Sequence, residues 1–269
     1  MSIFESVVLG VVQGLTEFLP VSSTGHLILT RTLFDVADSN ALAFDAVLHL
    51  ATAAAVIVYF FPDIWLLIQA GLRKLSRLPV NKRDETLLYS LLIATVPAVV
   101  LGLSLESLME STFRSPLLVA GVLIAGSLFF MYAEWVYQKT PRTNEITIKK
   151  GFKIGLFQTL ALIPGMSRSG ATICGGMLLG LSREEAARFA FLLAVPVITG
   201  AGLKKFIEML SSNEIVLWLP VLIGAAVSFT VGLTAIHFML RFVKTHTLWP
   251  FIWYRIVLAS FVIFITVFG

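Results

Sequence analysis

The residues in this sequence that could do chemistry gather in two short segments, and each segment interrupts an otherwise apolar stretch. The first reads GLTEFLPVSSTGH, residues 14–26, and follows directly after Gln13. Gln13 and Glu17 are four residues apart and therefore share one face of a helix, which Pro20 ends. The polar side chains that follow the proline are those of Ser22, Ser23, Thr24 and His26. A carboxylate, a run of hydroxyls and an imidazole so close together predict nucleophilic or acid–base chemistry.

The hydroxyls of this segment have a second interpretation, which the sequence leaves open. Serine and threonine are preferred N-cap residues, so Ser22 could cap the returning helix rather than bind a ligand. Glu17 and His26 together favour a functional interpretation, because ionisable groups at membrane depth are costly and mark functional sites.

The second segment reads PGMSRSGAT, residues 164–172, and its composition predicts an anion-binding loop. Its glycines let backbone N–H groups approach a ligand, and the helix that follows points its positive end into the loop. Arg168 adds a permanently charged, forked donor that suits phosphate. An ion pair between Arg168 and Glu17 is an alternative role, and it is compatible with a phosphate site.

The chain that must hold these segments is too apolar for a soluble protein. Of its 269 residues, 57% are hydrophobic and 13% are charged, and its mean hydropathy is +0.90, which excludes ordinary soluble domains, disordered chains and fibrous repeats. The formal net charge of +4 is attributed to the basic loops of a membrane protein rather than to nucleic-acid binding. The single cysteine, Cys174, excludes an intrachain disulfide, and we expect no removable signal peptide.

Six apolar stretches are long enough to cross a bilayer, which takes about 20 residues. The two stretches that carry the polar segments, residues 7–33 and 154–181, differ because the arms on either side of each break are too short to cross. Each is therefore predicted to be a re-entrant helix–loop–helix hairpin with its tip inside the membrane, where irregular backbone must be buried in protein or line a wet cavity. The six predicted spans are 42–68, 86–104, 115–137, 186–206, 216–240 and 250–268.

The distribution of basic residues supports two re-entrant hairpins. With both hairpins re-entrant, 14 Lys and Arg residues fall in loops on one side of the membrane and 4 on the other, which is the bias expected of cytoplasmic loops. Both chain termini are then expected outside.

The two halves of the chain also match at an offset of 145 residues. The matched pairs include Gly10 with Gly155, Gln13 with Gln158, Ser22 with Ser167, and Gly25 with Gly170. Each half has one hairpin followed by three spans, and an odd number of spans makes the second half inverted. The prediction is an all-α integral membrane protein with one membrane domain over residues 1–269 and inverted-topology repeats over about 1–137 and 151–269. The broken helices of such repeats meet near the bilayer midplane and form the site.

Several ionisable residues outside the two segments are assigned structural roles. Asp45 and His49 are four residues apart and either extend the site or pair with each other, and we favour the pair. Glu134 is expected at the membrane interface, and Arg255 is expected to reach toward the interface from within the last span.

Both polar segments closely resemble the two signature motifs of the bacterial undecaprenyl pyrophosphate phosphatase family (UppP/BacA), and the resemblance covers essentially the whole chain. It implies the inverted-repeat fold with two re-entrant hairpins. It implies hydrolysis of the terminal phosphate of undecaprenyl pyrophosphate, which recycles the lipid carrier for cell-wall synthesis and is associated with bacitracin resistance. It also implies a divalent cation, Mg²⁺ or Ca²⁺, and a place in the bacterial cytoplasmic (inner) membrane with the active site facing the periplasm or outer surface.

The resemblance assigns roles residue by residue. Ser23 is implied as the nucleophile, with His26, Glu17 and Arg168 as the other catalytic residues. Glu17 and Gln13 fill the element implied to hold the metal. Many members have Glu where this chain has Gln13, so that Glu17 alone supplies negative charge here. The implied pyrophosphate-binding residues are Arg168, Ser167, Ser169, Thr172, Gly165, Thr24 and Ser22.

Two classes of function fit these residues. The first is a lipid pyrophosphate phosphatase, and the alternative is a lipid-phosphate flippase or anion transporter, because inverted repeats with broken helices are typical of transporters. A transporter needs Arg168 but no nucleophile, so Ser23 and His26 favour the enzyme. The expected partners are the lipid substrate and membrane lipids, with no nucleic acid, and the sequence leaves a homodimer open.

Overall fold

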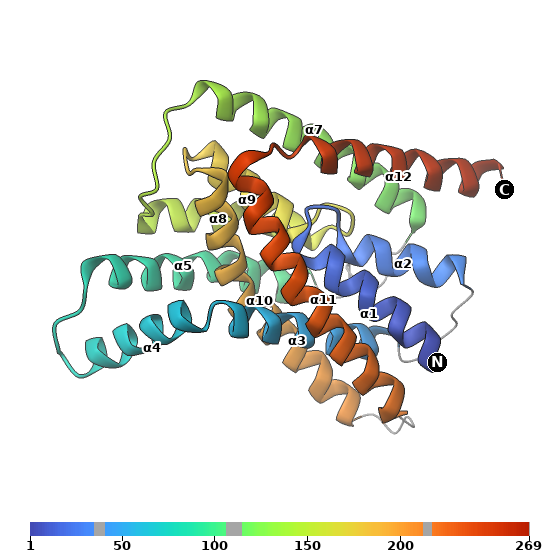
Figure 1. The fold of residues 1–269 in the computed structure, drawn as a ribbon, viewed down its shortest axis with the longest axis horizontal. Coiled ribbons are helices and arrows are strands. Elements are labelled where there is room, and N and C mark those ends of the chain that lie inside the picture. Colours follow the sequence, from blue (N-terminus) through green and yellow to red (C-terminus); the bar gives the residue numbers. More distant parts are fainter. Residues whose placement is uncertain (35–40, 106–114, 212–216, 269) are drawn as a thin grey trace.

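The computed structural model of this protein describes residues 1–34, 41–105, 115–211 and 217–268. Over these residues the chain is all-α, and its extended pairing is limited to one isolated bridge between Thr143 and Leu181. The helices are α1 (Ile3–Phe18), α2 (Ser23–Leu33), α3 (Ala41–Tyr59), α4 (Phe61–Leu75), α5 (Lys82–Ser104), α7 (Pro116–Lys139), α8 (Ile148–Thr159), the 3₁₀ helix η1 (Leu160–Leu162), α9 (Arg168–Leu178), α10 (Arg183–Ser211), α11 (Trp218–Thr245) and α12 (Trp249–Phe268). Figure 1 shows their arrangement.

Among the helices of the described ranges, five are long and apolar enough to cross a membrane: α5, α7, α10, α11 and α12. They confirm a multi-pass membrane protein and match five of the six predicted spans. The sixth, predicted over residues 42–68, is not one straight helix: the chain breaks at Phe60 and α4 runs at 83° to α3, so this stretch is a span only if the bent pair counts as one. The reason is Pro62 in the first turn of α4, since proline cannot continue the hydrogen bonds of a preceding helix but is tolerated where a new helix begins.

The two stretches that carry the polar segments form pairs of short helices. The pairs are α1 with α2 and α8 with α9, and these helices contain between 11 and 16 residues. In Figure 1 the first pair enters from the right-hand end of the molecule and the second from the left-hand end, and both turn back in the middle. At about 1.5 Å per residue, even the longest of these helices is shorter than the hydrocarbon core of a bilayer, about 30 Å.

The two turns use the same local geometry. Ser22 precedes α2 with φ 78°, and Ser167 precedes α9 with φ 76°, both in the left-handed region that L-residues rarely adopt. Each serine hydroxyl accepts a hydrogen bond from the backbone N–H three residues later, at Gly25 and Gly170. The two serines are a matched pair at the 145-residue offset, so the parallel between the halves extends from residue types to backbone conformation.

Glycines let each hairpin pack closely against a helix from the other half of the chain. A methyl group added at Gly10 of α1 would lie 2.6 Å from the Gly224 carbonyl oxygen of α11. A methyl group added at Gly155 of α8 would collide with the backbone of Ala94 in α5. Small residues at such crossings allow helix backbones to approach and pack in the absence of a hydrophobic driving force.

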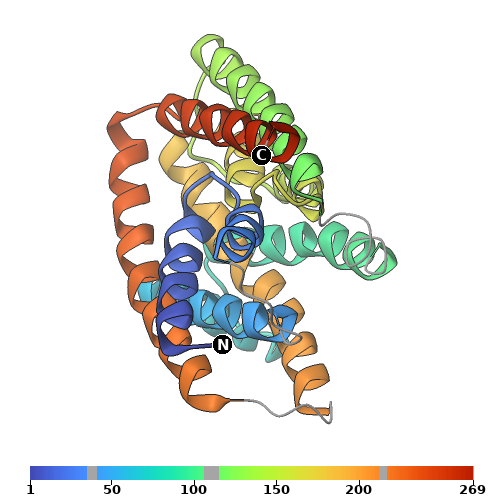
Figure 2. The ribbon, with the colours of Figure 1, turned by 90° about the vertical axis from the view of Figure 1, so that its right-hand side faces the viewer.

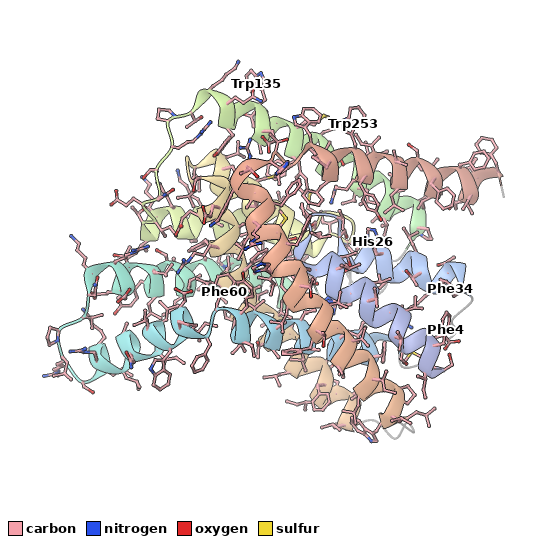
Figure 3. All side chains as sticks on the ribbon, in the orientation of Figure 1. Phe4, His26, Phe34, Phe60, Trp135 and Trp253 are labelled. Atoms are coloured by element: carbon pink, nitrogen blue, oxygen red, sulfur yellow. The ribbon has the colours of Figure 1, made fainter. Side chains whose placement is uncertain are left out.

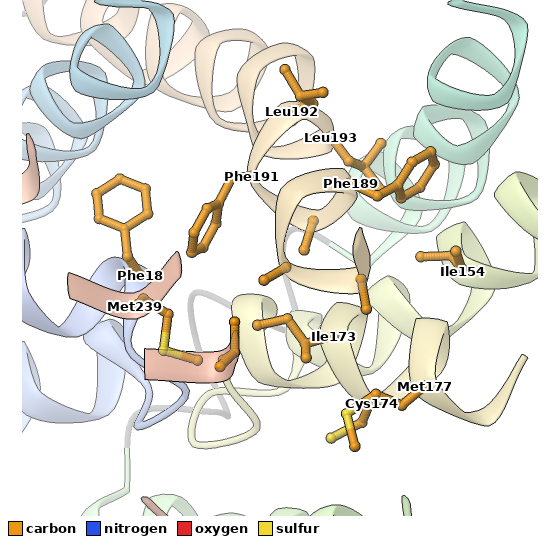
Figure 4. Packing of buried hydrophobic residues seen from close by; sticks show 14 of the residues in the cluster. Phe18, Ile154, Ile173, Cys174, Met177, Phe189, Phe191, Leu192, Leu193 and Met239 are labelled. Atoms are coloured by element: carbon orange, nitrogen blue, oxygen red, sulfur yellow. The ribbon is translucent and has the colours of Figure 1, made fainter. Parts of the chain in front are cut away.

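The main core lies where α1, α9 and α10 meet, as Figure 4 shows. Phe18 and Phe191 face each other there, with their ring centroids 5.5 Å apart in an edge-on arrangement. Cys174 is fully buried in the same cluster. Phe18 directly follows Glu17, so the core fixes the end of α1 on which the first polar segment depends.

The two ends of the molecule differ in composition. The N-terminus and the C-terminal end of α12 lie at one end of the long axis, on the right in Figure 1 and toward the viewer in Figure 2. The connection between α4 and α5 and the connection between α7 and α8 lie at the opposite end. These connections and the adjoining helix ends carry ten of the basic residues that the sequence places on one side. The exposed apolar side chains along the helices, such as Trp253 in Figure 3, suit a lipid environment.

The glycine crossing between α1 and α11 predicts a stability defect. Gly10→Ala should lower the free energy of unfolding by about 1–3 kcal/mol, because the new methyl group meets backbone that cannot turn away. Gly121→Ala is the matched control, since nothing lies within 4 Å of a methyl group there. The midpoint of unfolding of the detergent-purified protein checks this, and equal midpoints for the two variants would show that the crossing is not tight.

Candidate active site

The tips of the two hairpins are joined by direct hydrogen bonds. Ser22 Oγ accepts from the backbone N–H of Gly165 at 3.2 Å as well as from its own helix at Gly25. Ser169 Oγ donates to the carbonyl of Leu19 at 3.2 Å. The two polar segments, about 145 residues apart in sequence, therefore form one site in the middle of the molecule.

Arg255 of α12 binds both hairpin tips. The prediction that its side chain reaches toward the membrane interface is therefore wrong. Its side chain is fully buried, with the guanidinium carbon 4.6 Å from the centre of the Phe130 ring. A guanidinium has five N–H donors, and here all five are used. Nε donates to Ser127 Oγ, Nη1 to the carbonyls of Pro20 and Met166, and Nη2 to those of Leu123 and Gly165, at 3.0–3.4 Å. Packing of α12 against α7 turns this side chain inward, which hydropathy alone does not reveal.

Glu17 is the centre of the site. Its carboxylate is buried, with 5% of the residue exposed. Oε2 accepts hydrogen bonds from Ser23 Oγ at 2.7 Å and from Gln13 Nε2 at 3.0 Å. Oε1 accepts from Arg168 Nη2 at 3.2 Å, so the expected contact between the two segments is an ion pair. One carboxylate thus contacts three of the residues that the sequence marks as candidates.

Two polar atoms at this centre are buried and have no hydrogen-bond partner among the residues that the structure describes. They are Arg168 Nε and Gln13 Oε1. Arg168 Nη1 donates to the Ala190 carbonyl of α10 at 3.2 Å, which fixes the plane of the guanidinium. A buried donor or acceptor without a partner costs about 1–3 kcal/mol, so such atoms point to a bound group. The free donor suits an anion and the free acceptor suits a cation.

His26 does not contact Glu17, Ser23 or Arg168. Its Nδ1 donates to the Ser22 carbonyl at 2.7 Å, and its Nε2 lies 2.8 Å from the Tyr254 hydroxyl. The imidazole also stacks on the Tyr254 ring at 5.7 Å between centroids, and Figure 3 shows it near the start of α2. Both ring nitrogens therefore have partners outside the Glu17 cluster, and His26 fixes the first turn of α2.

His49 of α3 occupies the place that the sequence suggested for His26. Its Nε2 lies 3.5 Å from Glu17 Oε2, and its side chain is 27% exposed. The favoured pairing of His49 with the Asp45 side chain is wrong, because His49 Nδ1 donates to the Asp45 backbone carbonyl at 2.7 Å and the Asp45 carboxylate pairs with Arg31 at 2.6 Å. The sequence signal was present as two polar residues on one face of an apolar helix, but the spacing does not reveal that this face meets α1.

The remaining candidate hydroxyls differ in accessibility. Ser167 caps α9, and Thr172 donates to the Arg168 carbonyl at 2.8 Å. With Ser22 and Ser169 they are buried and engaged in bonds within the tips. Ser23 is half-buried and Thr24 is exposed. Gly165 has φ 104°, a conformation that glycine tolerates where the second tip turns.

Glu134 is buried inside the protein near the C-terminal end of α7. It is 1% exposed and accepts from Arg183 Nε at 3.0 Å and from the backbone N–H of Leu248 at 2.7 Å. This pair ties α7 to the beginning of α10 and to the residue before α12. It lies outside the Glu17 cluster and is structural.

Comparison with known proteins identifies the family. The family described as "Bacitracin resistance protein BacA" matches residues 6–261. This chain belongs to the BacA family. A relative named undecaprenyl-diphosphatase from Trichlorobacter lovleyi is 43% identical over 258 residues, which cover 95% of this chain and 94% of the relative. Relatives of the same name from Desulforudis audaxviator and Alteromonas mediterranea are 43% and 39% identical and cover 98% and 97% of this chain.

The divalent cation implied for BacA proteins can be tested against the donors that are present. Among the described residues, no three His, Cys, Asp or Glu side chains converge closely enough to hold a metal ion. Glu17 and the unpartnered Gln13 Oε1 offer two oxygens, which suit Mg²⁺ or Ca²⁺. Mg²⁺ is often held by one or two carboxylates together with substrate phosphates. The residues therefore fit a cation that binds with a phosphate substrate.

The five hydrogen bonds of Arg255 can be tested by substitution. Arg255→Lys should lower the unfolding midpoint and abolish activity, because lysine has three donors and leaves carbonyls of the BacA hairpin tips unbonded, at about 1–3 kcal/mol each. Arg241→Lys, at an exposed position of α11, is the control. An unchanged midpoint for Arg255→Lys in the detergent-purified protein would mean that the tips hold together without this clamp.

Proposed function

We propose that this protein is an undecaprenyl-diphosphatase, which hydrolyses the terminal phosphate of undecaprenyl pyrophosphate to give undecaprenyl phosphate and inorganic phosphate. The observation that carries the proposal is the contact of Ser23 Oγ and Arg168 with one buried carboxylate, that of Glu17, where the hairpin tips meet. Membership of the BacA family and the shared name of its relatives support the choice of substrate. A site between membrane helices suits a phosphate carried on a lipid tail.

In the proposed reaction Ser23 is the nucleophile. Its Oγ already donates to Glu17 Oε2 at 2.7 Å, so the carboxylate orients the hydroxyl and can accept its proton. A bond forms between Ser23 Oγ and the terminal phosphorus, and the bond from that phosphorus to the bridging oxygen breaks, releasing undecaprenyl phosphate. Water then attacks the phosphorus of the phosphoserine, and the bond from phosphorus to Ser23 Oγ breaks. Ser23 Oγ takes back a proton, and inorganic phosphate is released.

Arg168 stabilises the charge of the transferred phosphoryl group. Its Nη1 and Nη2 each donate one N–H, to the Ala190 carbonyl and to Glu17, and the unpartnered Nε–H is among the remaining N–H groups that can bind a phosphate oxygen. Thr24, which is exposed, and the N-terminus of α9 lie at the same tips and add donors to the pyrophosphate site. The hydroxyls of Ser167 and Ser169 bond to each other and to the Leu19 carbonyl, so they shape the second tip. A divalent cation held by Glu17 and Gln13 would neutralise negative charge on the phosphates.

His26 has a positioning role in this proposal. Its Nδ1–H fixes the Ser22 carbonyl, and Ser22 directly precedes the nucleophile. Because both of its ring nitrogens are engaged, His26 acts on Ser23 through the backbone of α2 rather than by taking its proton.

The membrane arrangement is part of the same proposal. The pairs α1–α2 and α8–α9 are re-entrant hairpins of two inverted repeats, over about residues 1–137 and 151–269. The short helices, the equivalent Ser22 and Ser167 turns and the entry of the hairpins from opposite ends support this arrangement. The basic loops lie in the cytoplasm, and the site opens to the periplasm or outer surface of the bacterial inner membrane. There the enzyme recycles the lipid carrier for cell-wall synthesis and contributes to bacitracin resistance.

The Ser23 variant tests both the activity and the covalent route. Detergent-purified protein should release phosphate from undecaprenyl pyrophosphate, and Ser23→Ala should reduce turnover by about a hundredfold or more, because the nucleophile is lost. Thr32→Ala, an exposed hydroxyl on the same helix, is the control. Phosphate bound to Ser23 should be detectable after rapid quenching.

Retention of a tenth of the turnover in Ser23→Ala would contradict the covalent route and favour direct attack by water activated by Glu17. Absence of phosphate release by the unaltered protein would contradict the enzyme itself. That result would favour the flippase or transporter alternative, which needs Arg168 but no nucleophile.

Arg168→Lys provides a separate prediction. The ammonium group keeps the charge but cannot reproduce a fork that contacts Ala190, Glu17 and a phosphate together. Loss of about 3 kcal/mol of transition-state stabilisation corresponds to roughly a hundredfold slower turnover. Steady-state phosphate release measures it, with Arg241→Lys as the control, and near-normal turnover would show that charge alone is sufficient.

A further inference from the structure

We propose that His49 is a ligand of the divalent cation in this protein, together with Glu17 Oε2 and Gln13 Oε1. The inference deepens the proposed function, on which the presence of the cation rests. The resemblance to the family gave only Gln13 and Glu17 for this role. His49 comes from α3, a helix that carries neither of the two signature segments.

The spacing of the polar atoms around Glu17 Oε2 suits a shared ion. Gln13 Nε2, Ser23 Oγ and His49 Nε2 lie 3.0, 2.7 and 3.5 Å from that oxygen. Ligands about 2.1 Å from an octahedral ion lie about 3 Å from their neighbours, so the side chains of Gln13 and His49 are within reach of ligand positions beside Glu17 Oε2. A small shift of the imidazole is enough to complete the geometry.

The orientation of the His49 ring is already that of a metal ligand. Nδ1 faces the Asp45 carbonyl at 2.7 Å, and because a carbonyl only accepts, Nδ1 carries the proton. In the neutral ring Nε2 then presents its lone pair to the site, and opposite it lies a carboxylate oxygen. Metal-bound histidines usually donate their second N–H to a carbonyl or carboxylate in this way.

Gln13 supplies the third ligand. Its side chain is fully buried, and its Oε1 has no hydrogen-bond partner among the described residues. Its Nε2 donates to Glu17 Oε2, so a half-turn of the amide would place Oε1 beside the same oxygen. With the amide in that orientation, the chain offers one carboxylate oxygen, one amide oxygen and one imidazole nitrogen at a single point.

The mixed ligand set predicts which ion binds best. Ca²⁺ and Mg²⁺ prefer oxygen ligands throughout, whereas Mn²⁺, a first-row transition ion, also binds sites that combine oxygen with nitrogen ligands. Mn²⁺ should therefore bind more tightly than Ca²⁺. His26 is not an alternative ligand, because both of its ring nitrogens are engaged with Ser22 and Tyr254.

The experiment uses Mn²⁺ itself as the probe on the full-length protein in detergent. Titration followed by electron paramagnetic resonance gives the affinity, and electron spin-echo modulation reports a nitrogen bound to the metal. The unaltered protein should show modulation from a histidine nitrogen, which changes when the protein is grown with nitrogen-15 histidine. His49→Gln should lose that signal and bind Mn²⁺ about tenfold more weakly or worse.

His237→Gln is the matched control, since His237 of α11 is exposed and pairs with Tyr59 at the C-terminal end of α3. It should keep the nitrogen signal and the affinity. Absence of histidine modulation in the unaltered protein, or its persistence in His49→Gln, would overturn the proposal. The first of these outcomes needs no variant, so a folding defect in His49→Gln leaves the test decisive.

Measuring phosphate release from undecaprenyl pyrophosphate with the same preparation distinguishes failure of the His49 proposal from failure of the proposed phosphatase function. Mn²⁺ bound through His49 without phosphate release would retain the metal site and contradict the phosphatase. Phosphate release with Mn²⁺ bound through oxygens alone would retain the phosphatase and contradict the role of His49.

Discussion

Two helix breaks in the middle of this protein leave buried backbone carbonyls outside the helices, and the rest of the structure depends on how they are satisfied. Arg255 satisfies them with one side chain. Its five donors bond to carbonyls of both hairpin tips and to two groups of α7. Among the residues that the structure describes, carbonyl dipoles and the face of Phe130 compensate the positive charge, and no carboxylate pairs with it. The clamp therefore positions both tips while leaving Glu17 available to the site.

Ser22 and Ser167 show how the backbone conformation at the two breaks is held. A non-glycine residue in the left-handed region costs about 1–3 kcal/mol and persists only when its surroundings hold it there. Ser22 is held by hydrogen bonds from its own helix and from Gly165 of the other hairpin, and Ser167 caps α9 in the equivalent way. Ser23 and Arg168 directly follow these strained positions, so the strain is located where it aims the two candidate catalytic side chains.

The sequence was sufficient where the information is local. The breaks, their short arms and the chemistry of Glu17, Ser23 and Arg168 follow from contiguous residues, and the structure brings these three together. The sequence was not sufficient to predict the role of a residue that depends on how helices distant in the chain pack together. Arg255 and His49 meet the site only because α12 and α3 lie against the hairpins, and His26 is turned away by Tyr254 of α12. The bend at Phe60 was missed because residues 42–68 are predominantly apolar, and the hydropathy does not show that a new helix begins at Phe61, next to Pro62.

The charges at the centre give a physical reason for the proposed cation. Glu17 and Arg168 form an ion pair 3.2 Å apart, so the two groups together contribute no net charge. A pyrophosphate that binds to Arg168 Nε brings several negative charges close to the Glu17 carboxylate, and at low dielectric their repulsion is large. With Glu in place of Gln13 a second protein charge would strengthen cation binding, but this chain has a neutral amide there. An imidazole ligand from His49 restores a donor without adding negative charge, so that the bound ion keeps more of its positive charge for the phosphates.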